Sequence, residues 1–92
     1  MRCYSNAQGS FIYDVHRYAR IEPQVLQVEL HPYLTQEPLV KYCKLLGLAI
    51  TAYSSFGPQS YVELGYQGAV SLLEHDTVSA IASKTQKSQC LL

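Results

Sequence analysis

The stretch from residue 25 to residue 60, VLQVELHPYLTQEPLVKYCKLLGLAITAYSSFGPQS, constrains the fold more than any other. It predicts a strand, a helix and a second strand over residues 25–30, 36–46 and 48–53. Pro32 has no amide hydrogen, so the first strand ends by His31. Thr35 is the expected N-cap of the helix, and Gly47 suits the left-handed backbone after its last turn. Two strands joined by one helix form a crossover, so we expect them to be parallel neighbours.

The two faces of the predicted strands differ in polarity. One face is apolar and consists of Leu26, Val28, Leu30, Leu48, Ile50 and Ala52. The other face carries Gln27 and Glu29 from the first strand, and Thr51 and Tyr53 from the second. Polar groups inside parallel strands suit a closed barrel whose interior contacts a ligand near the carboxyl ends of its strands. The alternative is that Gln27 and Glu29 only satisfy each other or the barrel's own polar interior.

Composition limits the remaining possibilities. A chain of 92 residues, of which 48% are hydrophobic, allows one small folded domain. Seven Lys and Arg balance seven Asp and Glu, so nothing in the charge indicates nucleic acid or an acidic membrane as a partner. Apolar runs are too short to cross a bilayer, and an apolar signal core is lacking, so we expect a cytoplasmic protein. Three cysteines favour free thiols, with Cys43 in the core.

Two further helices flank the central stretch. The first is expected over residues 11–20, with Ser10 as its cap and an apolar face made of Phe11, Ile12, Val15, Tyr18 and Ala19. The second is expected over residues 76–86. The four residues before Ser5 are too few to predict a strand from their own pattern.

Several kinds of site have no support in the sequence. The serines lack the G-x-S-x-G context of a hydrolase nucleophile, and neither glycine-rich phosphate-binding motif is present. The three histidines lack metal-ligand spacing, so no metal site is expected. The loop after the second strand differs, because backbone amides and hydroxyls around Ser54 and Ser55 can approach a phosphate.

The sequence resembles the aldo-keto reductase family, and within it the fungal NAD(P)H-dependent D-xylose reductases. The resemblance rests on QVELHPYLTQEPLVKYCKLLG followed by ITAYSSFGPQSYVEL, and it covers about residues 5 to 89. It implies a (β/α)8 TIM barrel in which NADPH or NADH reduces aldehydes such as aldose sugars. Residues 1–92 then form an incomplete aldo-keto reductase domain: a middle-to-late barrel fragment of α/β class, with about three βα units and parallel strands.

The resemblance also implies residues that contact the nicotinamide end of the cofactor. Ser5 and Asn6 match the Ser-Asn pair that hydrogen-bonds the carboxamide, and Gln27 matches the glutamine that contacts the same group. Tyr53 matches the tyrosine whose ring stacks on the nicotinamide. The alternation of the strands selects Gln27 and Tyr53 independently, since both lie on the polar face.

The loop after Tyr53 is implied to contact the rest of the cofactor. Ser54, Ser55 and Phe56 match the start of the segment along the pyrophosphate. Gln59 and Glu63 match positions in the xylose reductases that reach the adenosine side.

The family's catalytic Asp, Tyr, Lys and His belong to the first four βα units, and none of them has a match in this sequence. No catalytic residue is therefore assigned, and we expect the chain alone to be inactive. Three hypotheses stay open: an aldo-keto reductase fragment that carries part of the cofactor site, a non-catalytic module that completes a barrel with another chain or with itself through open sheet edges, and an unrelated small α/β protein.

Overall fold

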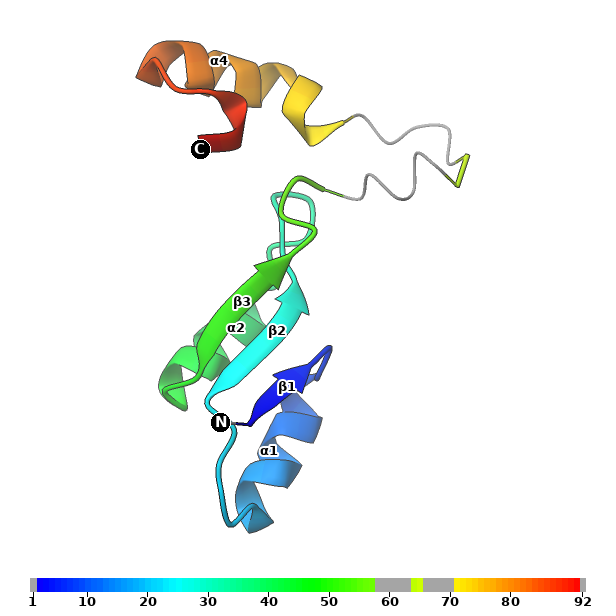
Figure 1. The fold of residues 1–92 in the computed structure, drawn as a ribbon, viewed down its shortest axis with the longest axis vertical. Helices are drawn as coiled ribbons and strands as arrows, with labels where there is room; N and C mark the ends of the chain where they lie inside the picture. Colours follow the sequence, from blue (N-terminus) through cyan, green and yellow to red (C-terminus); the bar gives the residue numbers. More distant parts are fainter. Residues whose placement is uncertain (1, 58–63, 66–70, 92) are drawn as a thin grey trace. The chain divides into compact units, whose positions relative to one another are not determined.

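The computed structural model describes residues 2–57, 64–65 and 71–91 (Figure 1). Two compact units, Met1–Tyr53 and Ser54–Leu92, make up the chain. In the described residues, the first unit contains a parallel sheet and two α-helices. The second contains one α-helix with a short 3-10 helix on either side.

The sheet of the first unit has three parallel strands in the order β1-β2-β3, and their bounds are Cys3–Ser5, Val25–Glu29 and Ala49–Tyr53. The prediction that the strands near residues 25–30 and 48–53 are parallel neighbours is confirmed. In the register, Gln27 lies between Ser5 on one side and Thr51 on the other, and Glu29 lies beside Tyr53. The carboxyl ends of all three strands therefore meet at one edge.

Strand β1 corrects the expectation that the residues before Ser5 are too few for a strand. It is held by the neighbouring strand, because the Gln24 amide donates to the Arg2 carbonyl at 3.1 Å and the Asn6 amide donates to the Gln27 carbonyl at 2.9 Å. The side chain of Tyr4 is buried in the core. Strand β1 thus forms because it pairs with β2 and because Tyr4 packs in the core. The local pattern of its three residues does not predict it.

Helices α1 (Gly9–Tyr18) and α2 (Glu37–Leu45) join the strands. Their predicted caps are wrong: Gln8 and Gln36 occupy the N-cap positions, and neither makes a side-chain capping hydrogen bond. Gln36 has a left-handed backbone with φ 44°, and its Nε2 instead donates to the Glu29 carbonyl at 2.6 Å. This bond ties the start of α2 to the end of β2. The left-handed conformation predicted for Gly47 is confirmed, with φ 71°.

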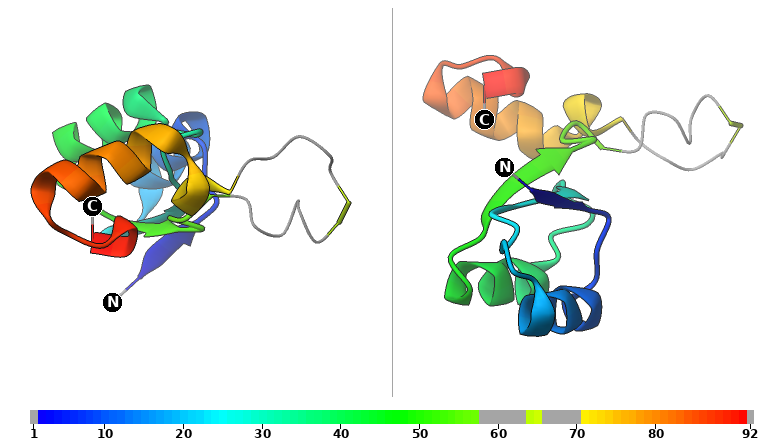
Figure 2. Two further views of the ribbon diagram at one scale, coloured as in Figure 1. Left: turned by 90° about the horizontal axis from the view of Figure 1, so that it is seen from above. Right: turned by 60° about the horizontal axis from the view of Figure 1, so that its bottom comes forward.

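Both helices cover the same face of the sheet (Figure 2), and the core lies between them and the strands. The buried cluster consists of Tyr4, Ala7, Ile12, Leu26, Val28, Cys43 and Leu48. Leu26 and Val28 enter it from β2, as the alternation of that strand predicts. Cys43 is fully buried, which confirms its predicted place in the core.

The predicted apolar face of the first helix is only partly correct. Ile12 is fully buried and Val15 packs against the core, whereas Phe11 and Tyr18 are 57% and 68% exposed. α1 packs at the β1 side of a sheet of three strands. The flanks of the helix therefore find little to pack against in the described part of this unit.

The second unit contains η1 (Leu72–Glu74), α4 (Asp76–Thr85) and η2 (Gln89–Leu91). The helix predicted over residues 76–86 is confirmed to within one residue. The Thr77 amide donates to His75 Nδ1 at 3.2 Å and caps the start of α4. Leu72 and Ala82 are buried, whereas Ile81 is 46% exposed.

The buried tyrosine of β1 carries an electrostatic cost that can be measured. Tyr4 is 5% exposed, and its hydroxyl has no hydrogen-bond partner among the described residues. Burial, and to a smaller extent the carboxylate of Glu22, raises the pKa of Tyr4 above 10.0. The unfolded chain therefore loses this proton at lower pH than the folded chain does. Ionisation of Tyr4 therefore does not lower the free energy of unfolding below about pH 10. Above that pH, the free energy of unfolding decreases as the pH rises through the folded-state pKa of Tyr4.

We expect Tyr4→Phe to increase the free energy of unfolding at neutral pH by about 1 kcal/mol, because it removes an unsatisfied buried hydroxyl and keeps the ring. The decline in stability above about pH 10 should become shallower. Urea unfolding at neutral and at alkaline pH measures both effects. Tyr13→Phe is the control, since the ring of Tyr13 is 59% exposed. A Tyr4→Phe chain less stable than its parent at neutral pH would contradict this account.

Candidate functional site

Four of the residues singled out from the sequence lie at the carboxyl edge of the sheet: Ser5, Asn6, Gln27 and Tyr53, here called the carboxyl-edge site. Ser5 ends β1, Asn6 follows it, Gln27 pairs with Ser5 in the register, and Tyr53 ends β3. All four are exposed, whereas their neighbours Tyr4, Leu26 and Val28 point into the core. The alternation of parallel strands thus separates a polar face from the face that packs on the helices.

A hydrogen bond across the sheet joins two members of this site. The Tyr53 hydroxyl donates to Asn6 Oδ1 at 2.8 Å. Tyr53 ends the third strand and Asn6 follows the first, so the bond spans β2. Asn6 is held a second time by its backbone amide, which donates to the Gln27 carbonyl at 2.9 Å. Its backbone is left-handed, with φ 52°, a conformation that asparagine adopts more readily than most residues.

The end of β2 is fixed by a separate set of contacts. His31, which is 8% exposed, places its Nε2 3.3 Å from Glu29 Oε1. The Leu30 amide donates to the Tyr53 carbonyl at 3.2 Å. The alternative that Gln27 and Glu29 satisfy each other is not seen, because Glu29 is engaged with His31. The Gln27 side chain is exposed and makes no hydrogen bond within the described residues.

The remaining predicted residues lie in the second unit. Ser54, Ser55 and Phe56 form an exposed turn, in which Ser54 is left-handed with φ 51° and the Gly57 amide donates to the Ser54 carbonyl at 2.9 Å. Gln59 and Glu63 lie outside the described residues.

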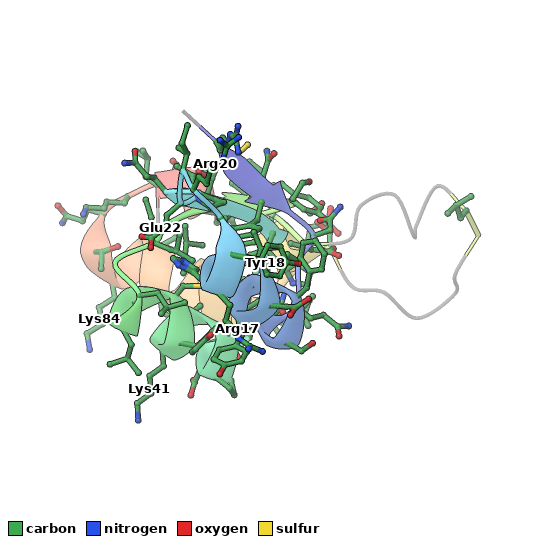
Figure 3. The ribbon with its side chains drawn as sticks, turned by 90° about the horizontal axis from the view of Figure 1, so that it is seen from below. Arg17, Tyr18, Arg20, Glu22, Lys41 and Lys84 are labelled. Carbon is green, nitrogen blue, oxygen red and sulfur yellow. The ribbon has the colours of Figure 1, made fainter. Side chains whose placement is uncertain are left out.

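Other features of the first unit lie away from this edge. A hollow of about 590 Å³ borders Arg2, which precedes β1, and Ile21, which precedes β2, so it lies at the amino ends of the strands. Lys41 projects outward from α2 (Figure 3), and the exposed Lys44 lies on the same helix.

Among residues 2–57, 64–65 and 71–91, no His, Cys, Asp and Glu side chains gather as a metal site would require. The same ranges contain no helix with the length and hydropathy of a membrane span.

The donors and acceptors of the carboxyl-edge site fit a flat ring that carries a carboxamide. Asn6 Oδ1 is taken by Tyr53, which leaves Nδ2 as a donor for a carbonyl oxygen. Ser5 and Gln27 are exposed beside it and offer a hydroxyl and a second amide. Tyr53 is 37% exposed, which leaves aromatic surface available for stacking.

Sequence reasoning missed two features of this site. It did not predict β1, which brings Ser5 beside Gln27, and it did not predict the bond between Tyr53 and Asn6. A signal for β1 exists, because a helix leading into a parallel strand is commonly preceded by a strand of the same sheet. No local pattern indicates a hydrogen bond between residues 47 positions apart.

The chain is similar to parts of known enzymes. It is 54% identical over 83 residues to an NAD(P)H-dependent D-xylose reductase of Kluyveromyces lactis, a match that covers 87% of this chain and 25% of the relative. It is 60% identical over 82 residues to a 4-dihydromethyl-trisporate dehydrogenase of Mucor mucedo, which covers 87% of this chain and 26% of the relative. The chain thus spans about a quarter of the length of these curated relatives. No family model matches it.

A solved structure supports the same relation in three dimensions. The crystal structure of an aldo-keto reductase from Bombyx mori in complex with NADP superposes with a TM-score of 0.79 at 38% sequence identity. The match covers 92% of this chain and 27% of that one. The implied resemblance is confirmed: the described fold, an α/β segment with three parallel strands, is similar to part of that aldo-keto reductase.

The left-handed backbone of Asn6 generates a stability prediction. Alanine at this position forces a Cβ atom into a conformation that costs about 1 kcal/mol, whereas glycine adopts it freely. Both substitutions remove the bond to Tyr53, so we expect Asn6→Ala to be about 1 kcal/mol less stable than Asn6→Gly in urea unfolding. At Ser5, which lies in a regular strand, the order should reverse. An Asn6→Ala chain at least as stable as the Asn6→Gly chain would argue against the left-handed backbone conformation of Asn6.

Proposed function

We propose that this chain, which corresponds in sequence and fold to about a quarter of an aldo-keto reductase, supplies the nicotinamide-contacting edge of an NAD(P)H-dependent oxidoreductase site. The observation that carries the proposal is the carboxyl-edge site, in which three parallel strands and the residue after β1 present an anchored asparagine, an exposed glutamine, a serine and an aromatic ring. The similar xylose reductase of Kluyveromyces lactis is named for its dependence on NAD(P)H, and the similar structure contains NADP.

Each residue has a defined role in this proposal. Ser5, Asn6 and Gln27 hydrogen-bond the carboxamide of the nicotinamide, and the ring of Tyr53 stacks on it. The cofactor, when bound, supplies the hydride for an aldehyde or aldose carbonyl. The chain's own residues hold the ring of the cofactor in one orientation at the carboxyl edge, where barrel enzymes carry out their chemistry.

The turn after β3 extends the contact along the cofactor. The hydroxyls of Ser54 and Ser55, with Phe56 beside them, lie along the pyrophosphate in this proposal, and Gln59 and Glu63 reach the adenosine side. Hydroxyls and backbone amides in a turn suit phosphate oxygens because they donate hydrogen bonds. The three cysteines are free thiols, which supports the cytoplasm as the location of the protein.

Reduction of a carbonyl also needs a proton donor beside its oxygen. The enzymes that the chain resembles use a tyrosine whose acidity is raised by a neighbouring lysine. Lys41 and Lys44 are exposed on α2, on the side of the sheet opposite the carboxyl-edge residues, and so do not serve this purpose. The chain by itself therefore binds cofactor weakly and does not reduce aldehydes, and the activity belongs to a complete barrel.

The test is a titration of the purified chain with NADPH, followed by nuclear magnetic resonance. Tyr53→Ala should weaken binding more than fivefold, because the lost aromatic contact alone is worth roughly 1 kcal/mol, or about fivefold, and the hydroxyl is lost as well. Tyr13→Ala is the matched control, since it removes an exposed tyrosine from α1. Equal affinity of the Tyr53→Ala chain and its parent would remove the role assigned to Tyr53. Consumption of NADPH with xylose above the no-protein control would refute the expected inactivity.

A second candidate function is assembly with another copy or another chain. In the described residues β1 and β3 are each paired on one side only, and the face opposite the helices exposes Ala49, Thr51 and Gln27. Unpaired strand edges are templates for further strands.

This second function predicts association that increases with concentration in sedimentation velocity. Thr51→Lys should reduce it, because a charge on an edge strand opposes pairing. Ser10→Lys, at an exposed position of α1, should have no effect. A chain that stays monomeric at every concentration would exclude assembly with another copy.

A further inference from the structure

We propose that the hydroxyl of Tyr53 is a positioning group that fixes the side-chain amide of Asn6, so that the carboxyl-edge site presents an oriented N–H donor before any ligand arrives. This inference rests on the function proposed above and deepens it. It assigns to Tyr53 a role that is separate from stacking.

The geometry restrains both partners of the 2.8 Å bond between Tyr53 and Asn6. Asn6 is held by its backbone amide, which donates to the carbonyl of Gln27, and by its left-handed conformation. Tyr53 is held in β3, where its carbonyl accepts from the amide of Leu30. The hydrogen bond therefore joins two restrained backbones through one short side chain and one rigid ring. Such a pair loses little further entropy when a ligand binds, which is the basis of preorganisation.

The bond also decides which end of the amide a ligand meets. A free asparagine side chain offers an acceptor at Oδ1 and two donors at Nδ2, and rotation of the amide group exchanges them. With Oδ1 held by the hydroxyl of Tyr53, the donor Nδ2 is the end left for a ligand. A carbonyl oxygen is the matching group. Gln27, exposed one strand away, can accept from an NH2 group, so the pair of amides selects a primary carboxamide on a flat ring.

The hydroxyl also restrains the ring that carries it. Tyr53 is 37% exposed, and an aromatic side chain at a strand end otherwise has freedom to turn about its Cα–Cβ bond. The bond to Asn6 holds the far end of the ring as well as the near end. Tyr53→Phe therefore keeps the stacking surface but releases both the ring and the amide, whereas Tyr53→Ala removes the surface itself.

The sequence makes the first test direct, because Asn6 is the only asparagine in the chain. Labelling with ¹⁵N-asparagine therefore marks one side-chain NH2 group, whose two proton signals share a single nitrogen shift and have no competing side-chain assignment. In the free protein we expect Tyr53→Phe to move this signal toward the position of free asparagine. Tyr13→Phe, which removes an exposed hydroxyl from α1, should leave it unchanged. An amide signal that does not respond to Tyr53→Phe, in a chain whose backbone spectrum stays folded, would overturn the proposal.

The second test adds NADPH as the probe. Tyr53→Phe should weaken binding about fivefold, the effect of one neutral hydrogen bond. Asn6→Asp keeps an acceptor for the hydroxyl and tolerates the left-handed backbone, but it has no N–H to donate, so it should weaken binding at least as much. Unchanged affinity in either variant would overturn the positioning role.

The two tests separate this inference from the proposed function. If the parent chain does not bind NADPH, the proposed function fails. The labelled amide still reports whether the hydroxyl of Tyr53 holds Asn6 in the free protein. A shifted amide signal together with weaker NADPH binding in both variants supports the proposal.

Discussion

The parallel pairing of β1, β2 and β3 is the constraint on which the rest of the first unit depends. Each helix returns the chain to the same end of the sheet, so the carboxyl ends of all three strands meet at one edge. The fully buried Ile12, Leu26 and Cys43 hold the helices against the strands. Because Leu26 belongs both to the paired strand β2 and to the core, a loss in the core should also displace the edge that carries the polar side chains.

The carboxyl-edge site follows from the same alternation that builds the core. Leu26 and Val28 point toward the helices, and Gln27 between them points away. Strand β2 therefore contributes both to the core and to the carboxyl-edge site. The bond between Tyr53 and Asn6 then crosses β2 and joins the outer strands. In the proposed function this bond matters beyond its modest net energy, because it orients an amide that a water-exposed loop would leave free to rotate.

The relation to aldo-keto reductases places these features within a larger architecture. The chain spans about a quarter of the length of its curated relatives and superposes well on a solved member. A barrel strand has neighbours on both sides, whereas β1 and β3 each have one neighbour in the described residues. In the proposed functions, cofactor contact and strand completion are therefore linked, since both use the same outer strands.

Local pattern by itself determined β2, α2 and β3. The period of the apolar residues defines each element, and Pro32 and Gly47 end the strand and the helix that precede them; both signals depend only on residues close in the sequence. It also determined that Gln27 and Tyr53 share a face. Only the tertiary structure decided that residues 3–5 form a strand, that Ser5 lies beside Gln27, and that Tyr53 reaches Asn6. These features depend on partners far apart in the chain, whose approach is set by strand pairing and burial and leaves no periodic signal in the sequence.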